Sequence, residues 1–276
     1  MTPSQITQAA EILAKAQLEH KRIERLSGEL RPQDRKTAVA IQDELARLIG
    51  HKVVGWKVGG ELVGRVFQPN LLKSPAELPE KIYGNAMVEA ELGFRMLSDL
   101  PARSAVYNAD EVAEHAMLVS AFELGGTHFS GEKIDPQIET DFLLAYAANS
   151  LQLGVVVGDE IKDWREMSLL DMKIELTIDG GSPVPGLPDE LRREPLDVLV
   201  LLANDLSQRG IGLEAGQATL SGIKSSDGTD TKYNFAHQFL GLNLGLELEN
   251  RYFSLIIAPQ IVFPVISTGT YNYEKS

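Results

Sequence analysis

The chain has 276 residues, 43% of them hydrophobic, which is enough for a sizeable core in one large domain with or without a small appendage. Its formal net charge of −13 argues against nucleic acid and anionic membranes as partners. Cysteine is absent, so disulfides, thiolate metal sites and cysteine nucleophiles are excluded, and any metal must be held by oxygen or histidine ligands.

The first 52 residues predict two helices and form an N-terminal helical segment. Thr2, Pro3 and Gln5 are typical of a capped helix start, and apolar residues follow at helical spacing. A second helix is expected from near Pro32 to a stop at Gly50. The chain has no apolar run of about 18 residues and no basic-then-apolar leader, so we expect a soluble, cytoplasmic protein.

The segment from Val53 to Gly60 predicts a short strand that carries a lysine between apolar residues and glycines. Glycines let the backbone approach a ligand closely, so Lys57 is a candidate for contact with an anion. The alternative is an edge-strand lysine that discourages aggregation. Residues 60–84 contain three prolines and are expected to be loop, with Arg65 as a weak candidate for an anion contact.

The segment from Met87 to Phe94 predicts a strand with two acids inserted among apolar residues. Because strand side chains alternate between faces, Glu89 and Glu91 point the same way, with Cα atoms roughly 6.5–7 Å apart. Two neighbouring carboxylates repel each other unless a cation lies between them. Taken alone, the pair also fits a solvated strand face.

A third acid, Glu123, ends the apolar run from Met117 to Phe122 and precedes two glycines. A carboxylate at the end of a buried run is rare unless it is paired or binds a metal. His128 follows closely and is either a hydrogen-bonded surface residue or an acid/base near neutral pH.

The remaining pattern alternates helices and strands without strict βαβ order. Helices are expected after Asn108 or Asp110, from Asp135-Pro136 to about Asn149, and from Pro195 to Gln208. Strands are expected at 154–158, 172–178, 217–222 and 240–248. This order predicts an α+β fold with a mixed, curled sheet.

Four motifs in order now resemble one family. Gly55–Gly59, Val88–Phe94, Ala121–Glu123 and Leu220–Gly222 are similar to the 2-oxopent-4-enoate hydratase and 4-oxalocrotonate decarboxylase family of the fumarylacetoacetase-like superfamily. The likeness covers roughly residues 30–224. It implies a catalytic domain at 53–276 with a curled β-roll of the fumarylacetoacetase C-terminal type, in which 224–276 is atypical.

The resemblance also implies the site. Glu89, Glu91 and Glu123 would bind Mg²⁺ or Mn²⁺, which agrees with the preference of these hard cations for carboxylates. Lys57 would be the active-site lysine beside the substrate, and Ser221 and Gly222 would lie in a substrate loop. The chain departs from the family where His128 replaces an arginine, and where Asn149, followed by Ser150, stands for an Asp-Asn pair in the substrate site.

The expected function is a metal-dependent hydratase of small 2-oxo-enoic or dienoic acids, as in degradation of aromatic compounds by meta cleavage. Decarboxylation of a 2-oxo diacid or C–C hydrolysis of an acylpyruvate would use the same site, and His128 is the candidate base for hydrolysis. A non-catalytic subunit that partners a true enzyme is the alternative from another class. A homo-oligomer with no nucleic-acid or membrane partner is expected.

Overall fold

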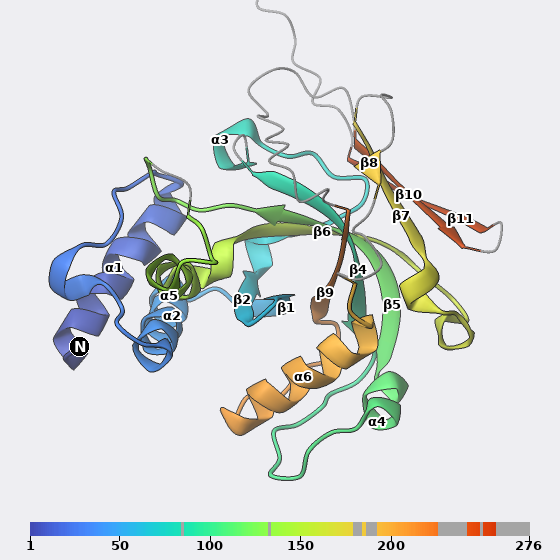
Figure 1. Ribbon diagram of the computed structural model, residues 1–276, viewed down its shortest axis with the longest axis horizontal. Helices are drawn as coiled ribbons and strands as arrows, with labels where there is room; N and C mark the ends of the chain where they lie inside the picture. Colours follow the sequence, from blue (N-terminus) through green and yellow to red (C-terminus); the bar gives the residue numbers. More distant parts are fainter. Residues whose placement is uncertain are drawn as a thin grey trace, which may run out of the picture.

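The computed structural model describes residues 1–83, 86–131, 134–178, 184–185, 192–225, 242–248 and 251–257. Figure 1 shows α1 (Pro3–Glu19), α2 (Arg35–Ile49) and α5 (Glu139–Ala147) gathered at one end of a curled sheet and a smaller sheet at the other end. The α+β class with a mixed sheet is therefore confirmed. No helix in the described ranges is both long and apolar enough to cross a membrane.

The helices begin and end largely where the capping residues place them. They are α1 (Pro3–Glu19), α2 (Arg35–Ile49), α3 (Glu80–Tyr83), α4 (Ala109–Glu114), α5 (Glu139–Ala147) and α6 (Pro195–Gln208). Thr2 and Gln5 form the predicted capping box of α1, and Gly50 ends α2 in the left-handed conformation.

Two predicted helix starts are wrong. Helix α2 begins at Arg35 because Asp34, rather than the segment at Pro32, accepts the hydrogen bond of the Thr37 amide. Helix α5 begins at Glu139, after a turn in which Asp135 accepts from the Gln137 amide.

The main sheet has seven strands in the order β2-β1-β9-β4-β5-β6-β3, and the second sheet has four in the order β11-β10-β7-β8. The strands are β1 (Val53–Gly59), β2 (Leu62–Phe67), β3 (Leu71–Lys73), β4 (Met87–Met96), β5 (Ala116–Gly125), β6 (Gln152–Glu160), β7 (Lys173–Ile178), β8 (Val184–Pro185), β9 (Ala218–Ser225), β10 (Leu242–Leu248) and β11 (Arg251–Ile257).

Strand β9 lies between β1 and β4 and joins the two halves of the main sheet. It runs parallel to β1 and antiparallel to β4. Two glycines permit the close approach: a Cβ at Gly55 would lie 2.3 Å from the Ala218 carbonyl oxygen, and one at Gly93 would lie 2.5 Å from the Thr219 carbonyl oxygen.

The expected loop at 60–84 is the largest error of the sequence-based prediction, because it contains β2, β3 and α3. Gly60, with a φ of 62°, turns the chain so that β2 pairs antiparallel with β1. All six residues of β2 are buried, so the strand has no alternation of polar and apolar residues from which it could be recognised.

Buried apolar side chains of the described residues form two large hydrophobic cores and a small third cluster. Of the large cores, one joins the main sheet to α4, α6 and β7, and the other joins α1 and α2 to α5 and to Leu62 and Phe67 of β2. Helices of the N-terminal segment thus share a core with the rest of the chain. The predicted strand near 240–248 is found as β10, whereas residues 226–241, 249–250 and 258–276 of the atypical region lie outside the described residues.

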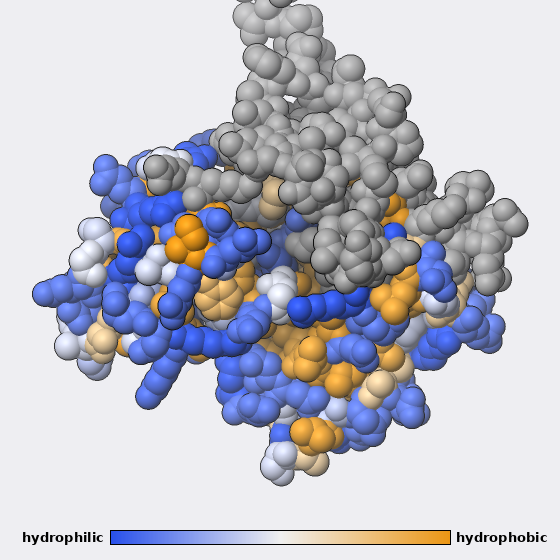
Figure 2. Space-filling model, viewed as in Figure 1, coloured by the Kyte–Doolittle hydropathy of each residue, from blue (hydrophilic) through white to orange (hydrophobic). Residues whose placement is uncertain are grey.

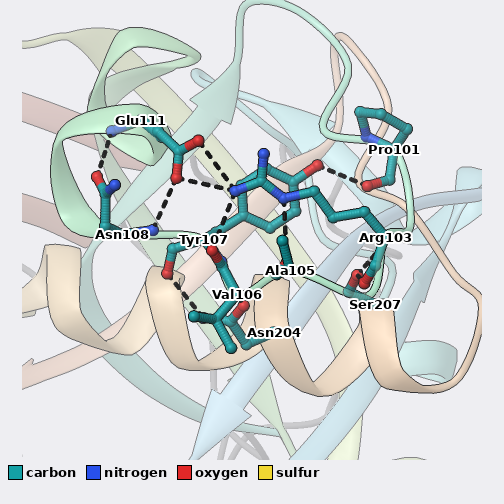
Figure 3. Close-up of polar contacts among 9 residues, drawn as sticks. All are labelled: Pro101, Arg103, Ala105, Val106, Tyr107, Asn108, Glu111, Asn204 and Ser207. Carbon is teal, nitrogen blue, oxygen red and sulfur yellow. Dashed lines mark hydrogen bonds and ion pairs between the residues drawn. The ribbon is translucent and has the colours of Figure 1, made fainter.

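A cluster of hydrogen bonds fastens the 101–108 loop to α6 (Figure 3). Asn204 accepts from the Tyr107 amide at 2.8 Å and donates to its carbonyl at 3.0 Å. Ser207 makes the same pair of bonds to the backbone of Arg103, at 2.7 and 2.8 Å. Arg103 lies over the Tyr107 ring and pairs with Glu111 at 2.8 Å. We call these residues, with Asn108 and Pro101, the α6 clamp.

Candidate metal centre

Three glutamates meet on one face of the main sheet. Glu89 and Glu91 lie two residues apart on β4, and Glu123 on β5 is directly opposite Glu89 in the antiparallel register. Their exposed fractions are 6%, 0% and 1%, and one oxygen of each lies within 4.8 Å of the others. The period-2 alternation of strands and the β4–β5 register therefore produce a compact, buried set of carboxylates.

Lys57 brings a positive charge to this set from β1. Its Nζ lies 3.0 Å from Oε1 of Glu123 and donates to the Ser150 carbonyl oxygen at 3.2 Å. The lysine is 5% exposed, so the ion pair is well shielded from water. Gly59 leaves room for it, because a Cβ there would lie 3.1 Å from both Cε and Nζ of Lys57.

The charges of the three glutamates favour a bound cation. Three carboxylates are gathered close to one another in a buried place, where like charges repel each other. A divalent cation bound among them would relieve this repulsion. Carboxylate oxygens without sulfur or imidazole suit Mg²⁺, Mn²⁺ or Ca²⁺, so the donor set fits the expected kind of metal.

Asn149 and Ser150 form a turn between α5 and β6 that reaches the site through its backbone. The Asn149 amide accepts from the Arg65 N–H at 2.8 Å and donates to the Arg65 carbonyl at 2.9 Å. Its side chain is thus engaged within the protein, and the carbonyl of Ser150 is the group that touches Lys57. Substrate binding by Asn149 stays a prediction.

Ser221 and Gly222 belong to β9 rather than to a loop. In the antiparallel register of β4 and β9, Glu91 is opposite Lys224 and Gly93 is opposite Leu220. Three residues of β9 therefore lie opposite the single residue Leu92 of β4. Such a bulge bends a strand and is common beside active sites. The backbone of Ser221 and Gly222 therefore runs next to the strand that carries Glu89 and Glu91, while their predicted substrate contacts stay untested.

His128 lies beside a pocket that is separate from the three glutamates. Its carbonyl accepts from the Ile23 amide at 2.8 Å, and its ring lines a pocket with Leu13, Gln17, Leu45, Gly126, Thr127, Phe129, Ala148, Gln152 and Leu153. None of the three glutamates nor Lys57 lines that pocket. Burial, with His20 and Arg22 nearby, lowers the pKa of His128 to about 4, so the imidazole is neutral at pH 7. A catalytic role of His128 stays a prediction.

Arg65 is an internal residue and not a free anion contact. It is 6% exposed, donates to Oε1 of Gln42 at 2.9 Å and pairs with Asp43. Its guanidinium also lies over the Trp56 ring. Gln42 was missed at the sequence level, although a glutamine on the apolar face formed by Ala38, Ile41 and Leu45 was a usable signal.

Similarity to known proteins is found at the level of structure. No protein-family model matches the sequence, and no curated protein matches it. The structure is similar to 4-oxalocrotonate decarboxylase from Pseudomonas putida G7 complexed with magnesium and adipate, with a TM-score of 0.70 and 18% identity over 94% of this chain and 98% of that one.

The same enzyme complexed with calcium and acetate matches with a TM-score of 0.68, again at 18% identity and with the same coverage. The chain therefore shares the fold of this decarboxylase, which bears the name of a family that the sequence motifs resemble.

Proposed function

We propose that this protein is a divalent-metal-dependent enzyme that acts on a small 2-oxo acid, and specifically a hydratase that adds water to a 2-oxo-enoic or dienoic acid. The observation that carries the proposal is the buried group of Glu89, Glu91 and Glu123, with Lys57 at 3.0 Å from Glu123. Support comes from the fold, which is also that of a decarboxylase solved with magnesium and a dicarboxylate.

The glutamates would hold the metal ion through one or more oxygens each, which leaves coordination positions for a ligand. When bound, the metal would act as a Lewis acid toward the 2-oxo group and the adjoining carboxylate of the substrate. The site is nearly closed to solvent at the glutamates, so electrostatic contacts there are stronger than in water.

Lys57 has two tasks in this proposal. Its ammonium group lies beside a metal ligand, where it can neutralise the substrate carboxylate and hold or move a proton at Nζ. The contact with the Ser150 carbonyl fixes the direction of Nζ, so the charge is oriented before a substrate arrives.

Decarboxylation of a 2-oxo diacid is the second candidate, and the fold match to a decarboxylase favours it. Hydrolysis would require a base that activates water. His128 is neutral at pH 7, as a base must be, but its pKa of about 4 makes it a weak one. The compact, buried carboxylates also weigh against a non-catalytic subunit, because such a subunit has no use for them.

Incubation with each substrate class in the presence of Mg²⁺ or Mn²⁺ tests the proposal. We expect loss of the dienol absorbance of 2-hydroxypenta-2,4-dienoate, and loss of that activity in Glu91→Gln. Release of CO₂ from a 2-oxo diacid without dienol hydration would establish the decarboxylase instead. Cleavage of an acylpyruvate that disappears in His128→Gln would establish the hydrolase, and inertness toward all three with metal bound would support the non-catalytic reading.

A homo-oligomer is proposed as well. Val106 and Leu201 are 73% and 63% exposed, and Figure 2 shows apolar side chains gathered on the face of the molecule near α6. Exposed apolar groups of this kind are commonly covered in an assembly. Sedimentation velocity gives the mass directly, and a monomer at micromolar concentration would overturn this part of the proposal.

A further inference from the structure

A strained turn lies against Lys57. Asn149, Ser150 and Leu151 have φ values of 64°, 57° and 60°, three consecutive residues in the left-handed conformation that non-glycine residues rarely adopt. Such backbone persists only where its surroundings impose it, and it is concentrated at functional sites. The carbonyl that this turn presents, that of Ser150, accepts the hydrogen bond of Lys57 Nζ.

Hydrogen bonds hold this turn on three sides. The Asn149 amide bonds both backbone groups of Arg65, and the Ser150 hydroxyl donates to the Val63 carbonyl at 2.8 Å. On the third side, the Leu151 carbonyl accepts from the Gly126 amide at 2.7 Å. Gly64 admits the turn, because a Cβ there would lie 2.7 Å from the Asn149 carbonyl oxygen.

Gln42 of helix α2 joins these supports. It is 0% exposed, and its Nε2 donates to the carbonyls of Val63 and Tyr146 at 2.9 Å each. The same nitrogen lies 3.4 Å from the Ser150 hydroxyl. Its Oε1 accepts from Arg65 at 2.9 Å. One side chain from the N-terminal segment thus connects β2, the end of α5 and the turn.

We propose that Gln42 is a positioning residue that acts on Lys57 through the turn at Ser150, so that helix α2 sets the place of the active-site ammonium group. The hydrogen-bond partners of Gln42 do not include Lys57 or the three glutamates. It holds the Ser150 carbonyl where Lys57 Nζ can meet that oxygen and Glu123 together. The catalytic meaning of this arrangement rests on the proposed function, whereas the effect on Lys57 does not.

Gln42→Met tests the inference, because methionine keeps the length of the side chain and loses its hydrogen bonds. The matched control is Asp34→Ala, which removes the cap of the same helix and weakens α2 without touching the turn. In the metal-free protein, acetylation of Lys57 by acetic anhydride is followed by mass spectrometry relative to the exposed Lys36. We expect about a tenfold faster reaction at Lys57 in Gln42→Met, since a released amine becomes accessible, and less than about a twofold change in the control.

A second measurement separates positioning from general damage. Calorimetric titration with Mn²⁺ should give a Kd within about threefold of wild type in Gln42→Met, since none of the three glutamates is a hydrogen-bond partner of Gln42. With a substrate in hand, kcat should fall about tenfold to a hundredfold with little change in KM, as expected when a catalytic group is misplaced.

An unchanged acetylation rate in Gln42→Met, or an equal rise in Asp34→Ala, would overturn the inference. If Gln42→Met does not fold, Ser150→Ala decides by the same readouts, because it removes the hydroxyl bond to Val63 and keeps the backbone. If no substrate is turned over, the proposed function fails while the acetylation result still decides on Gln42.

Discussion

The α6 clamp and the metal centre are both polar clusters, but they meet opposite requirements. In the clamp, the side chains of Asn204, Ser207 and Arg103 bond to backbone groups or to an opposite charge (Figure 3). In the metal centre, three acids with exposed fractions of 6% or less each have one oxygen within 4.8 Å of the others, and Lys57 pairs with Glu123. Matched polar groups stabilise a fold, whereas like charges concentrated in a buried place are typical of functional sites.

Lys57→Met should have the largest effect on the metal-free protein. It removes the cation from a buried pair, so the free energy of unfolding should fall by about 3–5 kcal/mol in urea titrations without metal. A saturating divalent cation should restore much of that loss. Lys36→Met, at an exposed lysine, serves as the control and should change nothing. Equal losses with and without metal would show that Lys57 is only a packing residue.

Without metal, Glu91→Gln should not lower the free energy of unfolding as Lys57→Met does. Removing one of three crowded charges should leave the metal-free protein at least as stable as wild type. The increase in unfolding free energy on adding metal should disappear in the variant. In wild type this increase is about 2.7 kcal/mol at a metal concentration of one hundred times Kd. Thermal melts with and without Mg²⁺ measure both effects. A variant that still responds to Mg²⁺ like wild type would contradict the assignment.

Asn204→Ala should weaken the clamp by a smaller amount. Two backbone groups of Tyr107 lose their partner, which corresponds to about 1–3 kcal/mol of unfolding free energy. Because the clamp carries no ligand site, the affinity for Mn²⁺ should stay at the wild-type value. A parallel loss of metal affinity would show that the two regions are coupled.

Glu111→Gln should have the smallest effect, and that effect should depend on pH. The hydrogen bond from Arg103, together with that from the Asn108 amide, lowers the pKa of Glu111 below its ordinary value. The contribution to stability is therefore complete above the unfolded pKa of about 4.3 and is lost as the pH falls through the lower folded value. Melts from pH 7 to pH 3.5 should show wild type and variant converging, and a constant gap would refute this account.

Local chemistry made part of the molecule predictable. Thr2 and Gln5 gave the start of α1, and the alternation at Glu89 and Glu91 placed both carboxylates on one face. The order of four short motifs gave Lys57 and Glu123 their place in the same site. These signals are local in the sequence or belong to a known family pattern, so a single chain was enough to find them.

Other features depend on distant parts of the chain and had no local signal. Strand β2 is buried along its whole length and was taken for loop. The Arg65 guanidinium donates hydrogen bonds to Gln42 and Asp43 of α2, and the contact between Lys57 and Ser150 joins residues 93 positions apart. The half-buried placement of His128 against the segment after α1 likewise follows from tertiary packing, which overrides its sequence neighbourhood.

The central position of β9 has a consequence for how the protein is made. In the main sheet, the β1–β2 pair (53–67) and the β4–β5 pair (87–125) are joined through residues 218–225, which are synthesised after both pairs. Until that late segment leaves the ribosome, facing edges of β1 and β4 stay open to wrong pairing. Lys57 on β1 is therefore joined to the sheet of the three glutamates only at the end of biosynthesis. A chain truncated before β9 cannot complete the sheet that carries the metal centre.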